Sequence, residues 1–451
     1  MVYSLHARSY QNEQATNGSP KLYIYPIKSL RPAEVSEGTL TAQGLAFDRR
    51  FMLLKVEAGE NGTEPALKNM HIPHFPEMGL FQTAIELPKT EDESGKLIVT
   101  YTPPSSREEG DTRPCETKRL EIPLRPLQVR PKKEFKTFKV TMHQSATTGY
   151  DMGPEYNEWF SECFGFPVVL GYLGLNSRNV LGALAPERRN KESWWRFEWN
   201  FWTGLLKRNP GWWPLLVALV LFNGIYRGLA MIQDGRDVPE EAIALTAVVV
   251  GVIMVGGHFA LRHFRKSQIT FADCAPFLVV SETSIDDVSA RLPEGEEMDR
   301  TKFRPNIVVS GAETAYEEDF WTELVVGPAK ARLLLSGNCV RCKSLNVDYE
   351  TGKAGTGEAG AVLKKLMKDR RVDRGAKFSP VFGRYSFLEP AGVGETIRVG
   401  DKVQIVAQGK ERTVTGECLM GELSYSPGSS LLTCLRLAGI DELGRNSVYI
   451  A

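Results

Sequence analysis

Short apolar runs separated by turn residues dominate the chain between residues 21 and 103. Four runs rich in β-branched and aromatic residues alternate with Gly, Pro and Asn, and they cover 21–30, 35–56, 78–87 and 95–103. Runs of this kind are typical of strands. One helical stretch follows at 153–165. The pattern predicts a barrel-like unit, mostly β, over residues 21–190.

A second unit that is mostly β is predicted over residues 268–412. Strand-like runs, again bounded by turn residues, cover 275–282, 305–311, 331–337, 384–390 and 401–407. A helix is expected at 284–292, opened by Ser284 and followed by acids in the first turn, which is the usual pattern of a helix N-terminus. Another helix is expected at 358–369.

Two apolar segments, 214–232 and 242–261, separate the two β units. At about 1.5 Å per helical residue, each would cross the roughly 30 Å apolar core of a bilayer. The link between them is net acidic and the outer flanks are basic, so the positive-inside rule places both flanks in the cytosol. We therefore expect a two-helix transmembrane hairpin within the segment 191–267, whose aromatic first part would lie along the membrane surface. The alternative is a pair of buried helices, favoured by Asn223 and Arg227 because charge inside a bilayer is costly.

The composition is that of a large chain with balanced charge. Of 451 residues 42% are hydrophobic, and 55 basic residues balance 55 acidic ones. A net charge of zero argues against a general binder of nucleic acid, so any anion site must be local. Seven dispersed cysteines indicate a reducing compartment. Residues 1–20 are polar and are expected to be disordered, with a mitochondrial presequence as the alternative.

The sequence contains a single Cys-x-x-Cys, formed by Cys339 and Cys342. A structural zinc site would need two more ligands, and the candidates, His71 and His74, lie far upstream. A redox dithiol would stand at the start of a helix, whereas this pair follows a strand-like run and precedes an extended segment. The favoured interpretation is one thiolate that binds a soft metal, with Arg341 stabilising it or holding an anionic cofactor. Two ordinary buried cysteines are the plain alternative.

Six motifs taken together resemble the MOSC-domain family. They are YPIKSL (25–30), GLAFDRRFML (44–53), FRPNIVVSG (303–311), CVRC (339–342), VDYETG (347–352) and SPVFGRYSFLEP with IRVGDKVQIV (379–406). Within that family they are most similar to the amidoxime-reducing components. The resemblance implies a fold that is mostly β with some α (α+β): an N-terminal MOSC β-barrel domain and a MOSC β-barrel domain, interrupted here by the hairpin. A molybdenum cofactor would bind between the two domains.

The resemblance also implies a set of site residues. Cys342 matches the molybdenum ligand, a role that suits a soft thiolate. Asp273 matches an acid near the metal that would move a proton or orient substrate, although Cys274 stands where the family usually has Thr or Ser. Cys339 is expected only to pack. Residues that match positions around the pterin and its phosphate are Lys28, Ser29, Arg49, Asp151, Arg304, Asn306 and Arg341.

The implied activity is that of a molybdenum cofactor-dependent oxidoreductase. It would reduce N-hydroxylated compounds such as amidoximes, hydroxylamines and N-oxides, with electrons from cytochrome b5 and NADH-cytochrome b5 reductase. The membrane hairpin would hold the soluble domains beside such donors on the cytosolic side, with the mitochondrial outer membrane as one candidate. No function is predicted for the tail 413–451.

Two other kinds of protein are compatible with the motifs. One is a molybdenum cofactor carrier or sulfurase-like protein without reductase activity. The sequence shows no aminotransferase-like part with a pyridoxal phosphate lysine, which disfavours a self-contained sulfurase. The other is a membrane tether that has lost its metal, which the retained CVRC motif disfavours.

Overall fold

The computed structural model describes most of both predicted β units. The described residues are 2–4, 21–58, 65–88, 90, 92–104, 116–180, 184–185 and 267–415. The predicted membrane segments 214–232 and 242–261 lie outside these residues, as does most of the predicted tail 413–451. Among the helices of the described ranges, none is both long and apolar enough to cross a membrane.

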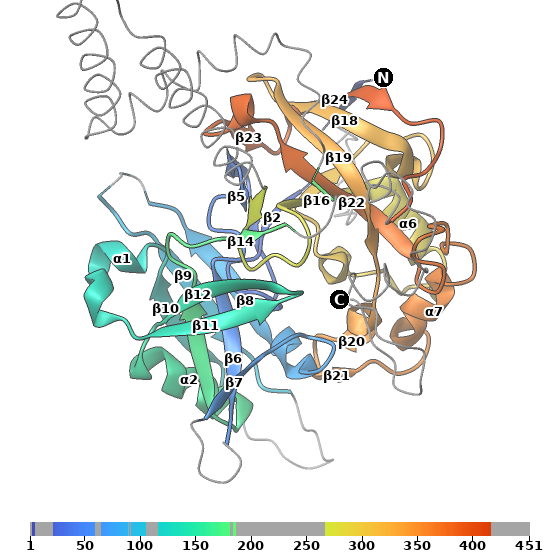
Figure 1. Cartoon of the computed structure of the whole chain (residues 1–451). Helices are drawn as coiled ribbons and strands as arrows, with labels where there is room; N and C mark the ends of the chain where they lie inside the picture. Colours follow the sequence, from blue (N-terminus) through green and yellow to red (C-terminus); the bar gives the residue numbers. More distant parts are fainter. Residues whose placement is uncertain are drawn as a thin grey trace, which may run out of the picture. The chain divides into compact units, whose positions relative to one another are not determined.

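The N-terminal part folds into two antiparallel sheets around one apolar core (Figure 1). Their strand orders are β11-β12-β13-β6-β7 and β10-β9-β8. The strands are β6 (Phe51–Glu57), β7 (Ala66–Asn69), β8 (Phe81–Glu86), β9 (Lys96–Tyr101), β10 (Lys118–Pro123), β11 (Thr137–Met142), β12 (Ser145–Asp151) and β13 (Val168–Tyr172). Phe51, Phe81 and Phe160 are fully buried in this core. Burial of such large apolar side chains is what stabilises the short strands.

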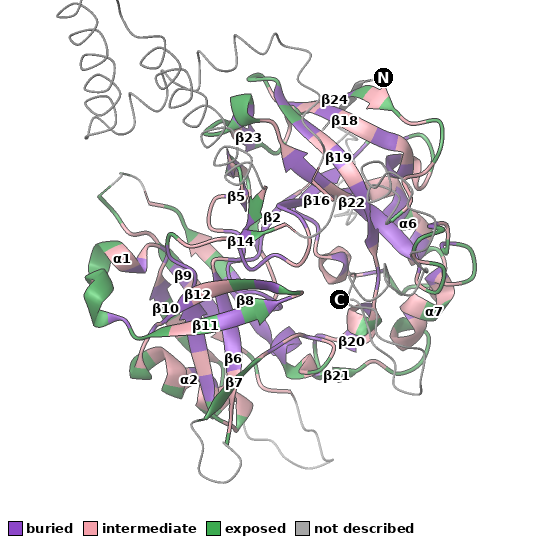
Figure 2. Ribbon diagram, viewed as in Figure 1, coloured by how far each residue is buried: buried purple, intermediate pink, exposed green. Residues whose placement is uncertain are grey.

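A nine-stranded sheet organises the second part, in the order β1-β24-β18-β19-β22-β16-β17-β2-β3. All five residues of β16 are buried (Figure 2), as expected of a central strand covered on both faces. The strands are β16 (Phe277–Ser281), β17 (Ile307–Val309), β18 (Trp321–Val326), β19 (Ala331–Val340), β22 (Val381–Leu388) and β24 (Lys402–Gln408).

The beginning of the chain takes part in this second sheet. Strands β2 (Leu22–Ile24) and β3 (Ala33–Val35) lie at one edge, next to β17. At the other edge β1 (Val2–Ser4) pairs with β24, so three residues of the stretch expected to be disordered form a strand. Strands β2 and β3 therefore belong to the sheet of the second unit, although the sequence pattern assigns them to the first.

Small sheets complete the described fold. One has the order β23-β4-β5, and two others are the pairs β14-β15 and β20-β21. Their bounds are β4 (Glu37–Thr41), β5 (Gly44–Leu45), β14 (Arg178–Asn179), β15 (Gln268–Ile269), β20 (Val347–Asp348), β21 (Lys353–Ala354) and β23 (Thr396–Arg398). The pair β14-β15 joins the residues on either side of the predicted membrane segment.

The helices are few and short, so the described part is mostly β, as predicted. The helix expected at 153–165 is α2 (Pro154–Phe164), which follows the short α1 (Pro126–Val129). The helix expected at 284–292 is α6 (Glu282–Ser289).

Two predicted helix bounds are wrong. Helix α6 begins directly where β16 ends, so Ser281 rather than Ser284 precedes its first residue. The Ser284 hydroxyl lies inside the helix and donates to Glu318 Oε2 at 2.8 Å. The helix expected at 358–369 is a 3-10 turn (Ala359–Ala361) followed by α7 (Val362–Leu366).

Candidate cofactor site

Two arginines from distant motifs share one tyrosine ring. The guanidinium carbons of Arg49 and Arg304 lie 4.9 and 4.5 Å from the centroid of the Tyr25 ring. Both arginines have left-handed backbones, with φ of 49° and 57°, which is uncommon for residues other than glycine and often marks a functional site. Burial raises the pKa of Tyr25 well above its ordinary value, so the phenol stays neutral. Two guanidinium groups therefore lie near the Tyr25 ring, and the neutral phenol does not compensate their positive charge.

Asn306 and Asp48 fix the position of Arg49. Asn306 Oδ1 accepts a hydrogen bond from Arg49 Nη1 at 3.2 Å, while its Nδ2 donates to the carbonyl of Tyr23 at 3.2 Å. Asp48 is fully buried; it accepts from Arg49 Nη1 and, at 2.8 Å, from the backbone N–H of Tyr25. Burial raises the pKa of Asp48 although Arg49 opposes the rise. Asn306 therefore orients Arg49 within the protein.

Arg304 is the least satisfied cation of the site. Its Nη1 and Nη2 atoms are shielded from solvent and have no hydrogen-bond partner among the described residues; the same holds for the Tyr25 hydroxyl. Burial raises the pKa of Tyr349, and the nearby positive charge of Arg304 opposes that rise. An unpaired guanidinium out of water is costly. Its planar fork fits a phosphate with paired oxygens.

The CVRC motif lies at the end of β19. Arg341 Nη1 donates to the Sγ atom of Cys339 at 2.8 Å, and its Nη2 donates to the carbonyl of Phe303 at 2.9 Å, next to Arg304. Cys339 is buried, as expected, but it also accepts a hydrogen bond, so it does more than pack. Cys342 is half-buried and directly precedes a 3-10 turn rather than the extended segment predicted there.

Lys28 and Asp273 form an ion pair. The ammonium of Lys28, whose side chain is 4% exposed, donates to Asp273 Oδ1, and the Asp273 side chain is 38% exposed. Burial opposes ionisation of Asp273, but Lys28, His143 and His71 together hold the pKa of its carboxyl well below the ordinary range. Asp273 is therefore ionised, and its negative charge neutralises the positive charge of Lys28.

Two further predicted residues have different surroundings. Ser29 is buried beside Lys28 and is a third predicted site residue with a left-handed backbone, φ 69°. The carboxylate of Asp151 instead accepts from the backbone N–H of Gly153 at 2.9 Å and from Asn157 Nδ2 at 2.8 Å. These bonds order the start of α2, so Asp151 is used inside the N-terminal part of the fold.

The described residues contain no group of three or more His, Cys, Asp or Glu side chains placed to hold a metal ion. A four-ligand zinc site around Cys339 and Cys342 is therefore not formed within those ranges. A metal that is already held by the sulfur atoms of an organic cofactor needs only one thiolate from the protein.

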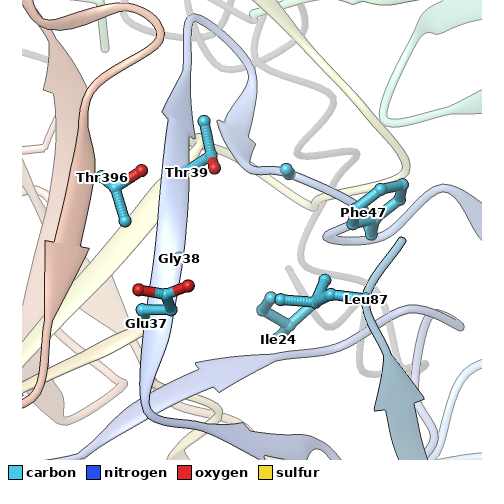
Figure 3. Close-up of a pocket in the computed structure, with 8 residues that line it drawn as sticks. Ile24, Glu37, Gly38, Thr39, Phe47, Leu87 and Thr396 are labelled. Carbon is cyan, nitrogen blue, oxygen red and sulfur yellow. The ribbon is translucent and has the colours of Figure 1, made fainter. Parts of the chain in front are cut away.

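A small hollow lies elsewhere on the fold (Figure 3). It is lined by Ile24, Glu37, Gly38, Thr39, Ala46, Phe47, Leu87 and Thr396. None of the predicted site residues is among them, and Glu37 is the only charged side chain in the lining. Without a cation, this hollow is not suited to an anionic cofactor.

Comparison with known proteins identifies the domains to which these segments belong. Residues 20–167 match the model of the MOSC N-terminal beta barrel domain, and residues 266–404 match the model of the MOSC domain. The chain carries both MOSC domains. Their matches cover the segments that supply Arg49, Arg304 and the CVRC motif.

Relatives of this MOSC protein include two kinds of named protein. Human mitochondrial amidoxime-reducing component 1 is 38% identical over 147 residues, which is 32% of this chain and 40% of the relative; the mouse protein of the same name is 38% identical over 145 residues. The molybdenum cofactor sulfurase of Aspergillus fumigatus is 24% identical over 426 residues, which is 85% of this chain and 41% of the relative. The chain thus spans about two fifths of the length of these relatives. A crystal structure of the YuaD protein from Bacillus subtilis matches 31% of this chain and 66% of its own length, with 13% identity and a TM-score of 0.19.

Several residues around the site of the MOSC protein have no counterpart in the sequence-based prediction. Tyr25 and Asp48 lie inside the recognised YPIKSL and GLAFDRRFML motifs and could have been found there. His143 and Arg178 lie outside all six motifs, and His71 was considered only as a possible zinc ligand. Only their proximity to Asp273 and Lys28 in the folded chain reveals them.

Proposed function

We propose that this MOSC protein is a molybdenum cofactor-dependent oxidoreductase that reduces N-hydroxylated compounds with electrons from an external donor. The observation that carries the proposal is the shielded, unpartnered guanidinium of Arg304 beside Arg49 and the Tyr25 ring. Paired cationic donors fit the phosphate of a pterin cofactor. The names of the amidoxime-reducing relatives support the same class of reaction.

Each side chain then has a defined task. Cys342 would supply the only thiolate from the protein to molybdenum. Arg304, with Arg49 beside it, would hold the phosphate of the cofactor. Arg341 ties the Cys342 strand end to the turn that carries Arg304, through its bond to the Phe303 carbonyl. When bound, the cofactor supplies two-electron removal of oxygen from nitrogen.

Asp273 would orient the substrate. Its carboxylate is held in the ionised form, and its side chain is partly exposed, so it can accept a hydrogen bond from the hydroxyl of an N–OH group. Lys28 holds that carboxylate from its buried side. The electron donors proposed for the whole protein are cytochrome b5 and NADH-cytochrome b5 reductase.

The test measures molybdenum content and benzamidoxime reduction, with cytochrome b5, its reductase and NADH, for wild type and Cys342→Ser. We expect wild type to contain molybdenum and reduce benzamidoxime, and the variant to lose both. A wild type without molybdenum would overturn the proposal, and a fully active Cys342→Ser would overturn the assignment of the ligand.

A carrier or sulfurase-like function is the second candidate. The observation in its favour is the alignment with a molybdenum cofactor sulfurase, which spans 85% of this chain. A carrier would bind the same cofactor through the same cations but would not reduce substrate. Molybdenum-loaded wild type that fails to reduce benzamidoxime, hydroxylamine and an N-oxide would favour this candidate.

We also propose that residues 214–232 and 242–261 anchor the protein to a membrane as a hairpin. The support is their apolar sequence with basic outer flanks, and the relatives named as mitochondrial make the mitochondrial outer membrane the first membrane to examine. The protein should resist extraction by alkaline carbonate from isolated membranes, and both flanks should be cut by protease added to intact mitochondria. Release by carbonate would contradict the anchor.

A further inference from the structure

The turn between β11 and β12 places a histidine in an unusual conformation. Met142 pairs with Ser145, so the hairpin loop consists of His143 and Gln144 alone, and their φ angles are 46° and 63°. A two-residue loop with both φ values positive is normally built from Asn-Gly or a similar pair. Holding His and Gln in this conformation is unfavourable, and such strain is typical of positions kept for a function.

The side chain of His143 reaches from solvent to Asp273. Its Nε2 atom is shielded from solvent and lies 3.5 Å from Asp273 Oδ1, while the side chain as a whole is 24% exposed. The Nε2 atom therefore faces the carboxylate, while part of the side chain remains exposed to water. This is an arrangement in which a group can take a proton from solvent and present it to the carboxylate beside it.

Charged neighbours define the surroundings of the His143–Asp273 pair. Lys28 binds the same oxygen, Asp273 Oδ1. Burial, together with Lys28, lowers the pKa of His71 to about 4, so that second imidazole is neutral near pH 7. Arg178 donates to the carbonyl of Met142 at 2.9 Å and to backbone carbonyls of the loop that carries Asp273. The hairpin and the Asp273 loop are thereby held together.

We propose that His143 is the proton source of this site and acts through Asp273. The inference rests on the proposed function, and none of the six motifs contains His143. The reaction converts an N–OH compound, two electrons and two protons into the N–H compound and water; the electrons come from the external donor. As the N–O bond breaks, a proton passes from His143 Nε2 by way of Asp273 to the leaving hydroxyl group. The imidazole regains a proton from solvent, and the second proton follows the same route.

The first test observes the pair itself in the full-length protein. The chain has 6 histidines, so selective labelling of histidine rings gives a small set of NMR signals, and His143→Gln assigns the one of interest. We expect the His143 ring signals to change in chemical shift in Asp273→Asn, because the carboxylate that faces Nε2 is lost. The signal of exposed His74 should not move. Unchanged His143 signals would overturn the proposal.

The second test compares kinetics of His143→Gln, His143→Ala and the control His74→Gln. Glutamine keeps an N–H hydrogen-bond donor near Asp273, but its amide cannot transfer a proton near neutral pH. With activity expressed per bound molybdenum, both His143 variants should lose at least about tenfold in kcat at pH 7, because the proton source is removed. Full activity of His143→Gln would mean that the residue only positions Asp273 and would overturn the proposal.

The two tests separate this inference from the proposed function. If wild type reduces benzamidoxime and the His143 variants do so equally well, only the proton source is wrong. If wild type carries no molybdenum or reduces nothing, the proposed function fails, and the NMR comparison still decides whether His143 and Asp273 lie against each other.

Discussion

The side-chain amide of Asn306 accepts a hydrogen bond from the guanidinium of Arg49 at 3.2 Å, and 257 positions of sequence separate the two residues. This bond joins the DRR motif of the first domain to the RPN motif of the second. Because Asn306 is fully buried and its other side-chain atom donates to the carbonyl of Tyr23, the amide is locked in one orientation. The cation site is thus built by contacts between the two domains.

Replacing Asn306 by alanine should therefore weaken both the fold and the site. The change leaves the Tyr23 carbonyl without that donor and removes one of the two side chains that fix Arg49. A buried polar group left unsatisfied typically costs about 1–3 kcal/mol. We expect a fall of that size in the free energy of unfolding in urea and a lower molybdenum content. Exposed Asn179→Ala is the matched control. Equal stability and equal metal content in Asn306→Ala and wild type would contradict the role of the bond.

Arg304→Met should separate stability from cofactor retention. The two Nη atoms of Arg304 have no hydrogen-bond partner among the described residues, so removal of the guanidinium should leave the cofactor-free protein at least as stable as wild type. The molybdenum content should nevertheless fall by about tenfold or more, equivalent to roughly 1.4 kcal/mol of binding. Urea unfolding and metal analysis measure the two effects. Arg119→Met, at a site 58% exposed, should change neither.

A strong loss of stability in cofactor-free Arg304→Met would show that Arg304 has a structural partner. In that case the shielded guanidinium could not be the observation that supports phosphate binding.

Cys339 is predicted to act through its hydrogen bond with Arg341. Serine keeps an acceptor at this position and alanine does not, so Cys339→Ser should retain most molybdenum whereas Cys339→Ala should lose a severalfold larger share. Metal analysis of purified protein measures both, with Cys163→Ala as a control in α2. Loss in Cys339→Ser as large as in Cys342→Ser would indicate that two cysteines bind the metal.

The local pattern of apolar residues predicted the strands well, because in a strand with one buried face the apolar side chains recur at every second residue. The run 95–103, for example, is β9 (Lys96–Tyr101). The pattern could not show that β2 (Leu22–Ile24) joins the second sheet, since a strand's neighbour depends on long-range pairing and the run itself would suit either sheet.

The residues of the candidate site could be predicted only where the resemblance to a known family points to them. The structure brings Arg49, Arg304 and Asn306 together, as the motifs imply. The same reasoning offered Asp151, whose carboxylate instead orders the start of α2. It did not identify His143, because nothing in the sequence near this histidine indicates that folding places it beside the carboxylate of Asp273.

Glu318 gives the stability of the fold a dependence on pH. It is fully buried, and burial, with a contribution from Asp319, raises its pKa to about 7, against 4.5 for an ordinary glutamate. Between these values the folded state holds a proton that the unfolded state has lost, so stability should fall as pH rises from about 4.5 to about 7. Glu318→Gln cannot ionise and should remove this decline, which makes the variant more stable than wild type at pH 8 by about 1–3 kcal/mol. Urea unfolding at pH 5 and pH 8 measures the effect, with exposed Glu294→Gln as the control; parallel pH profiles for wild type and Glu318→Gln would show that Glu318 is ionised in the folded state throughout.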